Sequence, residues 1–271
     1  MGPVLTFDIV STSNPRIQRL ARLSQRRHRD REGVFTVEGR RLFQRAIAAG
    51  LTPIEVYGDG SVDLGVTGMV WVKPDVLDGV SYRDRSEGLI AVFPQQLADL
   101  ASFNPRAPAL LLVAESLEKP GNLGAMLRTA DAVGADAVVS LAGRVDRFNP
   151  NVLRASTGAC FTIPTIVSDI VSFSDWLTTH GIDLVAADPM GSTTIWDADL
   201  RGPVAVMVGA EDRGLSHEAR SRADPLVTIP MEGAVVDSLN ASVAMALLAY
   251  EAVRQRRPQP AMQPRVSSVS K

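Results

Sequence analysis

Three polar loops each follow a predicted buried strand, and together they hold most of the residues of this chain that could bind a ligand or promote a reaction. They comprise residues 115–129, 206–216 and 229–242. Ligands of open α/β sheets bind at the carboxyl ends of the strands, which is where such loops lie. We therefore take the three loops as the candidate site.

Each loop also has a purely structural interpretation. In the first, Gly121 and Gly124 permit close approach of backbone to backbone or to a ligand, and Asn122 can cap a helix. In the second and third, Ser216 and Ser238 are suitable helix caps. The first loop is not a Walker loop, because no Gly-Lys-Ser/Thr follows, and it lacks the third glycine of the dinucleotide fingerprint. Taken one at a time, the loops favour the structural interpretation.

Taken together, in this order and spacing, the loops resemble the three motifs of the SpoU branch of the SPOUT methyltransferases, which methylate ribose 2′-hydroxyls of RNA. The matching residues are Asn122, Gly124, Arg128 and Thr129, then Gly209, Glu211 and Gly214, then residues 229–231 and 238–240. The resemblance extends to residues 153–159, 13–16 and 35–39, so it covers nearly the whole chain except the tail. The layout resembles most the bacterial ribosomal RNA enzymes, including the thiostrepton-resistance type.

The resemblance implies an α/β fold in two parts. A SPOUT-type parallel sheet with a deep trefoil knot follows a small α/β, ribosomal-protein-like RNA-binding domain. Because chains generally avoid knots, residue patterning alone would not propose one. The family binds S-adenosylmethionine in the knot, and its homodimers bring the first-motif arginine close to the partner's cosubstrate. The implied cosubstrate contacts are Ala187, Gly209, Ile229, Ser238 and Leu239.

The resemblance also names Arg128 as a catalytic residue. The methyl group of a sulfonium is already activated, but a ribose hydroxyl is a poor nucleophile near neutral pH, so the site must align it and accept or stabilise its proton. A guanidinium stays protonated in proteins. We therefore expect Arg128 to bind the adjacent phosphate and stabilise the developing alkoxide, with the base unassigned. The remaining catalytic candidates, which position loops and substrate, are Asn122, Glu211, Ser238 and Asn240.

Apolar patterning divides the chain into two units. Residues 1–93 form the predicted RNA-binding domain, residues 94–108 a linker with three prolines, residues 109–257 the methyltransferase domain, and residues 258–271 a disordered tail rich in proline and serine. In the first unit we expect a helix from Pro15 capped by Asn14, and a second helix from Glu38 to Ala49. The predicted strands are 54–57, 69–72, 88–93, 109–114, 137–141, 184–187, 204–208 and 226–229.

The last predicted helix runs from Leu239 to about Arg256 and carries a long apolar stripe. The stripe consists of Leu239, Val243, Leu247, Tyr250 and Val253. Dimerisation through this helix would account for a stripe of this length.

Arginines are concentrated near the start of the chain, although the formal net charge is −2. Seven lie between positions 16 and 31, opposed within that window only by Asp30. Such a segment can neutralise phosphates, a contact that positions RNA without reading its sequence. A solvated helix face is the alternative. The RNA-binding candidates are Arg16, Arg19, Arg26 and Arg27, together with Arg154 in the second unit.

Composition excludes several other classes of protein. A chain of 271 residues with 45% hydrophobic and 21% charged residues is typical of a globular protein. The single cysteine, Cys160, excludes an internal disulfide framework and fits a reducing cytosol. No apolar run reaches the length of a membrane span, so we expect a cytoplasmic protein with no membrane partner. His28, His180 and His217 lack ligand spacing, and we predict no metal site.

Three alternative functions stay open at this point. The first is methylation of transfer RNA in place of ribosomal RNA. A ribosome-assembly factor that kept the fold but lost catalysis is disfavoured by the intact Asn122, Arg128, Glu211, Ser238 and Asn240. A dinucleotide-dependent enzyme is disfavoured by the incomplete glycine fingerprint and by the basic segment.

Overall fold

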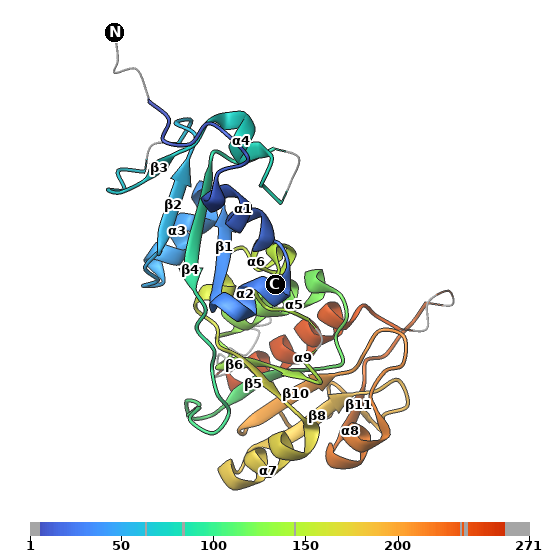
Figure 1. Ribbon diagram of the computed structural model, residues 1–271. Coiled ribbons are helices and arrows are strands. Elements are labelled where there is room, and N and C mark those ends of the chain that lie inside the picture. Colours follow the sequence, from blue (N-terminus) through green and yellow to red (C-terminus); the bar gives the residue numbers. More distant parts are fainter. Residues whose placement is uncertain are drawn as a thin grey trace, which may run out of the picture.

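The computed structural model describes residues 6–62, 64–82, 85–143, 145–233, 235 and 238–257. The chain forms two α/β units, each built around its own sheet (Figure 1). The predicted disordered tail, residues 258–271, lies outside the described residues. Among the described helices, none has both the length and the apolar character that a membrane crossing requires.

The first unit is a four-stranded sheet with short helices. Strand β4 pairs antiparallel with β1 and β2, β2 pairs parallel with β3, and the order is β1-β4-β2-β3. The strands are β1 (Val34–Glu38), β2 (Glu55–Gly58), β3 (Val70–Trp71) and β4 (Leu89–Pro94). The helices are α1 (Pro15–Arg22), α2 (Arg26–Glu32), α3 (Arg40–Ala48) and α4 (Pro74–Asp78).

Two local predictions in this unit have different outcomes. Helix α1 begins at Pro15, and Asn14 caps it by accepting a hydrogen bond from the Arg16 amide at 2.9 Å, as predicted. The prediction of a helix from Glu38 was wrong in its start. Residues 34–38 form β1 because their β-branched and aromatic side chains pack into the core, and Gly39, at φ +84°, separates the strand from α3.

The second unit is a seven-stranded sheet in the order β7-β6-β5-β10-β8-β11-β9, and every neighbouring pair is parallel. The predicted parallel α/β architecture is confirmed. The strands are β5 (Leu110–Glu115), β6 (Ala137–Leu141), β7 (Thr165–Ser168), β8 (Asp183–Ala187), β9 (Thr193–Thr194), β10 (Val204–Val208) and β11 (Leu226–Thr228). The helices are α5 (Pro120–Val133), α6 (Pro150–Ala155), the 3-10 turn η1 (Ala159–Phe161), α7 (Ile170–His180), α8 (His217–Arg222) and α9 (Ala241–Arg256).

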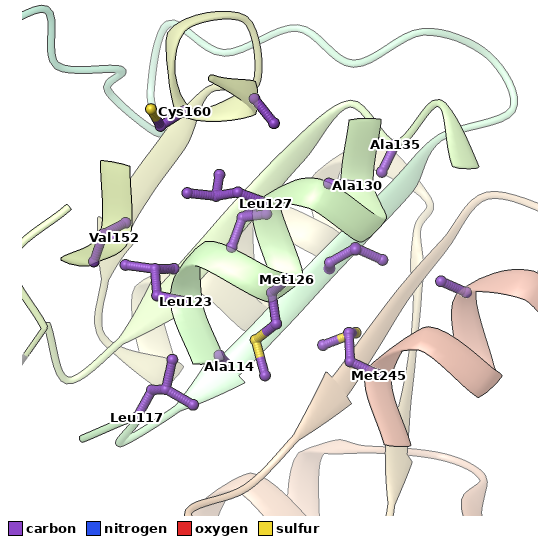
Figure 2. Close-up of a cluster of buried hydrophobic side chains, with 14 of the residues drawn as sticks. Ala114, Leu117, Leu123, Met126, Leu127, Ala130, Ala135, Val152, Cys160 and Met245 are labelled. Carbon is purple, nitrogen blue, oxygen red and sulfur yellow. The ribbon is translucent and has the colours of Figure 1, made fainter. Parts of the chain in front are cut away.

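Helix α5 carries the first candidate loop and packs between α6 and α9. Figure 2 shows Leu123 and Leu127 near Val152 on one side, and Met126 facing Met245 on the other. A Cβ atom at Gly124 would lie 2.4 Å from the Cβ of Ala155 and 2.9 Å from a backbone oxygen of α6. This motif glycine is therefore required by the close contact of two helices.

Among the described residues, one of the three clusters of buried hydrophobic residues includes side chains from both units. The Phe35 ring of β1 lies 4.6 Å from the Phe148 ring, centroid to centroid, and 5.8 Å from the Phe93 ring. The most deeply buried ion pair between described residues of the two units joins Arg29 and Asp146. Arg29 is 2% exposed, donates to the Leu23 backbone oxygen at 2.6 Å, and pairs with Asp146 of the second unit.

Replacing Asp146 should destabilise the protein strongly. In Asp146→Asn the buried Arg29 guanidinium loses its counter-charge, which typically costs about 3–5 kcal/mol. The measurement is the free energy of unfolding in urea. Asp30→Asn is the matched control, because Asp30 pairs with Arg26 on the exposed face of α2 and its loss should cost under about 1 kcal/mol. Equal effects of the two substitutions would contradict this account.

Candidate active site

A cavity of about 540 Å³ opens at the carboxyl ends of β8, β10 and β11. This volume lies within the range of small-molecule sites, which is about 300–1,000 Å³. All five residues predicted to contact the cosubstrate line it: Ala187, Gly209, Ile229, Ser238 and Leu239. They come from three strand ends and from the segment before α9, so the structure brings together positions that are far apart in the sequence.

The loop after β10 is a tight turn that only glycine permits at its start. The Ala210 amide donates to the Gly214 oxygen at 3.0 Å, and the Gly214 amide donates back to the Ala210 oxygen at 2.9 Å. A Cβ atom at Gly209 would lie 2.3 Å from the Gly214 carbonyl carbon and 2.4 Å from the Leu215 nitrogen. The motif glycine therefore lets the backbone double back and form one wall of the cavity.

Glu211 is the centre of a polar cluster that joins all three loops. Its carboxylate accepts hydrogen bonds from the side-chain amides of Asn122 and Asn240, the latter at 3.2 Å, and forms an ion pair with Lys119. The Asn240 amide also lies 3.3 Å from the Asn122 oxygen. Three of the predicted catalytic residues thus contact one another beside the cavity, and Ser238 lines the cavity itself.

Helix caps hold two of these loops in place. Asn240 caps α9, its side-chain oxygen accepting from the Ser242 amide at 2.9 Å. The last helix therefore begins at Ala241. The prediction that it begins at Leu239 with Ser238 as its cap was wrong, because Asn240, two residues further along the chain, takes the cap position. Ser216 caps α8 as predicted.

A buried carboxylate anchors the second loop to the neighbouring strand. Glu115, at the end of β5, accepts hydrogen bonds from the Ser216 amide at 2.8 Å and from its hydroxyl at 2.6 Å. Since β5 and β10 are adjacent, this contact fixes the start of α8 relative to the sheet.

Arg128 lies apart from this cluster. It is exposed on α5, does not line the cavity, and forms no ion pair or hydrogen bond with any described residue. It follows Asn122 by six residues, or about 9 Å along the helix axis. Within a single chain the structure does not bring this candidate to the others.

The RNA-binding candidates are partly paired within the protein. Arg16 and Arg19 both pair with Glu55, and Arg19 also pairs with Glu32 at 2.6 Å. These acidic partners lie outside the window of sequence in which only Asp30 opposed the arginines. The remaining arginines differ in exposure: Arg26 and Arg27 lie on the surface, whereas Arg154 is mostly buried and pairs with Glu38 at 3.4 Å.

Three charged residues of the site were not among those predicted from the sequence: Lys119, Asp188 and Arg220. Lys119 pairs with Glu211, and Asp188 forms an ion pair with Arg220 at 2.9 Å on the cavity wall. Asp188 directly follows β8, and a carboxylate at the end of a buried strand is a recognisable pattern. In the sequence, nothing in the residues around Arg220 and Lys119 distinguishes them from the other basic residues of the chain.

Metal binding and thiol chemistry find no support in the part of the chain that the structure describes. No group of three or more histidine, cysteine, aspartate or glutamate side chains there could hold a metal ion, and the expectation of no metal stays a prediction. Cys160 is buried, and burial raises its pKa to about 11, so that the side chain is a neutral thiol at neutral pH.

The cavity combines apolar side chains with polar groups, as a site for a nucleoside does. Apolar side chains such as Val227, Ile229 and Leu239 can cover a flat base, and the glycine turn exposes backbone groups to the ligand. The Asp188 carboxylate is buried against the same space, and one of its oxygens has no hydrogen-bond partner. These features fit S-adenosylmethionine, which combines an adenosine with a charged amino-acid tail.

Both units of the chain are similar to families of known proteins. Residues 109–250 match the SpoU rRNA Methylase family, and residues 14–91 match the MRM3-like substrate binding domain. The chain is 37% identical over 199 residues to a 23S rRNA (guanosine-2′-O-)-methyltransferase, RlmB, of Ralstonia nicotianae, an alignment that covers 71% of this chain and 79% of the relative.

Solved structures are similar over the full fold. An RNA 2′-O ribose methyltransferase is 43% identical with a TM-score of 0.81, and the match covers 92% of this chain and 98% of the other. The SpoU methyltransferase AviRb from Streptomyces viridochromogenes, in complex with the cofactor S-adenosylmethionine (AdoMet), is 30% identical with a TM-score of 0.82, over 90% of this chain and 98% of the other.

Gly209→Ala should abolish ligand binding at the cavity. The added methyl group cannot fit against the backbone of residues 214 and 215, so the turn must open and the cavity wall must move. We expect the affinity for S-adenosylmethionine, measured by calorimetry, to fall at least about 100-fold, the equivalent of about 2.7 kcal/mol.

The matched control is Gly202→Ala, where an added Cβ meets no atom within 4 Å. That variant should bind as the wild type does. Unchanged affinity in Gly209→Ala, with the fold intact by circular dichroism, would contradict the assignment of this turn to the ligand site.

Proposed function

The chain belongs to the SpoU rRNA methylase family, and from this we propose that it transfers the methyl group of S-adenosylmethionine to a ribose 2′-hydroxyl of 23S ribosomal RNA. The observation that carries the proposal is the Glu211 cluster, in which residues from all three family motifs contact one another beside the cavity. An assembly factor without catalysis would not need this arrangement. Transfer RNA, the other alternative, is less well supported, because the Ralstonia relative is named as a 23S rRNA enzyme.

The cavity residues would hold the cosubstrate by shape and by backbone contacts. Ile229 and Leu239 supply apolar surface for the base, and the turn at Gly209 brings backbone groups close to the ligand. S-adenosylmethionine supplies an activated methyl group when it is bound. The protein must therefore exclude water, orient the ribose hydroxyl and promote the loss of the hydroxyl proton.

The Glu211 cluster acts by positioning. The carboxylate holds the amides of Asn122 and Asn240, and these residues lie at the starts of α5 and α9. These contacts fix the starts of two helices against the turn after β10. They would thereby hold the cavity in a constant position relative to the surface on which RNA docks. Ser238 lines the cavity two residues before Asn240.

Arg128 is the residue that we propose to stabilise the reacting ribose oxygen. A guanidinium remains charged throughout the physiological range, so it can bind a phosphate and stabilise negative charge on the ribose oxygen as the proton leaves. Its freedom from ion pairs with the described residues leaves it available for RNA. Because it is separated from the cavity of its own chain, we propose that it serves the cavity of a partner.

An apolar face on α9 supports a homodimer. Val243, Leu247 and Tyr250 are 47%, 43% and 54% exposed, and they repeat at the spacing of one helix face. The opposite face, which includes Met245 and Leu248, is fully buried against the sheet and α5. A helix that is apolar on both faces is expected to be covered, and a second copy of the chain would cover it by two-fold symmetry.

The knot and the location of the protein belong to the same proposal. Strand β11 lies between β8 and β9, although it follows both in the chain, which is the kind of insertion that threading through a loop produces. We propose a cytoplasmic location, which is supported by the single buried cysteine, since it suits a reducing compartment, and by the proposed ribosomal RNA substrate.

Arg128→Ala should abolish methyl transfer but preserve cosubstrate binding. We expect incorporation of labelled methyl groups into 23S ribosomal RNA to fall at least about 100-fold, as on removal of one charge-stabilising donor from an active site. The affinity for S-adenosylmethionine by calorimetry should change less than about threefold. Arg201→Ala, at an exposed arginine that pairs with Asp199, is the control and should retain full activity.

The same variant tests whether Arg128 acts across a dimer. An equal mixture of Arg128→Ala and Gly209→Ala chains, allowed to exchange, contains mixed dimers in which one intact cavity faces one intact arginine. About a quarter of the wild-type activity should return. Full turnover by Arg128→Ala alone would exclude a catalytic role, and no recovery in mixed dimers verified by ultracentrifugation would exclude action across the interface.

A further inference from the structure

Asp188 is a buried carboxylate on the cavity wall that the roles assigned above do not use. Its side chain is 1% exposed, and it directly follows β8. One carboxylate oxygen accepts a hydrogen bond from the Met190 amide at 2.9 Å, whereas the other, Oδ2, has no hydrogen-bond partner. Buried polar atoms are normally satisfied, so an unsatisfied one at the edge of a ligand cavity indicates a bond that the ligand completes.

The backbone around Asp188 is fixed before any ligand binds. Its amide donates to the Val227 oxygen of β11 at 2.9 Å, and its own oxygen accepts from the Gly191 amide at 3.0 Å. A Cβ atom at Gly191 would lie 2.7 Å from the Leu226 oxygen, so this short turn rests directly on the backbone of β11. The carboxylate is therefore held in one place, as a preorganised acceptor must be.

Arg220 compensates the charge of Asp188 without occupying its hydrogen-bonding capacity. Its Nε atom lies 2.9 Å from Oδ2, an ion-pair distance, but the N–H group is not aligned for a hydrogen bond with that oxygen. Arg220 also lies near the glycine turn after β10, since a Cβ at Gly214 would have the guanidinium as its nearest neighbour at 3.8 Å. The pair thus spans two of the cavity walls.

We propose that Asp188 accepts a hydrogen bond from a ribose hydroxyl of the bound cosubstrate, an inference that rests on the proposed function. A carboxylate whose charge is already balanced by an arginine suits a neutral hydroxyl donor. An ammonium group at the same place would be repelled by the positive charge of Arg220. The position in the sheet agrees. Asp188 follows the strand adjacent to the one that carries the glycine turn, which is where dinucleotide-binding sheets place the carboxylate for ribose.

The alternative is that Asp188 and Arg220 only hold the two loops together. That role predicts an equal loss of affinity for every ligand of the cavity when Asp188 is changed. Recognition of a hydroxyl predicts a loss that depends on whether the ligand carries that hydroxyl. The two can therefore be separated by combining a protein variant with ligand variants.

The experiment measures, by calorimetry, binding of S-adenosylhomocysteine and of its 2′-deoxy and 3′-deoxy analogues to the wild-type protein and to Asp188→Asn. In the wild type, removing the hydroxyl that Asp188 binds should weaken binding about 10- to 100-fold. Asp188→Asn should bind the parent ligand more weakly by a similar factor and distinguish it from the deoxy analogue by less than about threefold. Losses that multiply, with undiminished discrimination in the variant, would overturn the proposal.

A third ligand distinguishes the two ends of the cosubstrate. Methylthioadenosine keeps the ribose but lacks the ammonium and carboxylate groups, so Asp188→Asn should weaken its binding as much as that of S-adenosylhomocysteine. Unchanged binding of methylthioadenosine would place the carboxylate at the amino-acid end and would also overturn the proposal.

Two further variants guard against loss of folding or of charge alone. Arg220→Gln breaks the ion pair but keeps the carboxylate, so this variant should still bind the deoxy analogue more weakly than the parent ligand. If Arg220→Gln bound the two ligands equally well, direct contact by Asp188 would be contradicted. Asp199→Asn removes an exposed carboxylate that does not line the cavity, and this variant should bind all ligands as the wild type does. Failure of the wild-type protein to bind S-adenosylhomocysteine would contradict the proposed function itself, a result distinct from the failures above.

Discussion

The site depends on the Glu211 carboxylate, which accepts hydrogen bonds and forms an ion pair with residues of the other loops. Asn122, Asn240 and Lys119 come from two different segments, and each places a donor on this one group. The carboxylate can gather them only because the carboxyl ends of β5 and β10 lie at one edge of a parallel sheet, and because Asn240 immediately precedes α9, which packs on α5. Electrostatic attraction thus completes an arrangement that strand pairing and helix packing have already brought within reach.

Close backbone contact is the second requirement, and it explains glycines that have no chemistry of their own. Gly209 lets the turn after β10 fold back on itself, and Gly191 lets the turn after β8 rest on β11. Gly124 serves the contact between α5 and α6 on the far side of the same helix that carries Asn122. Two of the turns that bound the cavity are therefore held by close backbone contacts, and a side chain at Gly209 or Gly191 would displace them.

Much of this could be predicted from the sequence, and the failures have physical causes. Strands β6 and β10 both occupy the predicted residues, because strands buried on both faces are almost entirely apolar: β10 has only apolar residues, and Ser140 is the one polar residue of β6. Strand β9 has two threonines, too short a pattern to recognise.

The burial of Arg29 could not be predicted either, because its partner Asp146 is more than a hundred residues away. Within the site, the loops were found as motifs, but the pairing of Lys119 with Glu211 and the position of Asp188 depend on the tertiary fold. Arg128 is the reverse case: its importance follows from family resemblance, and a single chain gives it no partner among the described residues.

The most direct measurement is the chemical position of the transferred methyl group. The purified protein is incubated with labelled S-adenosylmethionine and 23S ribosomal RNA, and the product is hydrolysed in alkali, which cannot cleave the backbone after a 2′-O-methylated ribose. Our account predicts that the label is recovered in one alkali-resistant dinucleotide and is lost in Arg128→Ala. Label on a base, or label that enters transfer RNA and not ribosomal RNA, would contradict it.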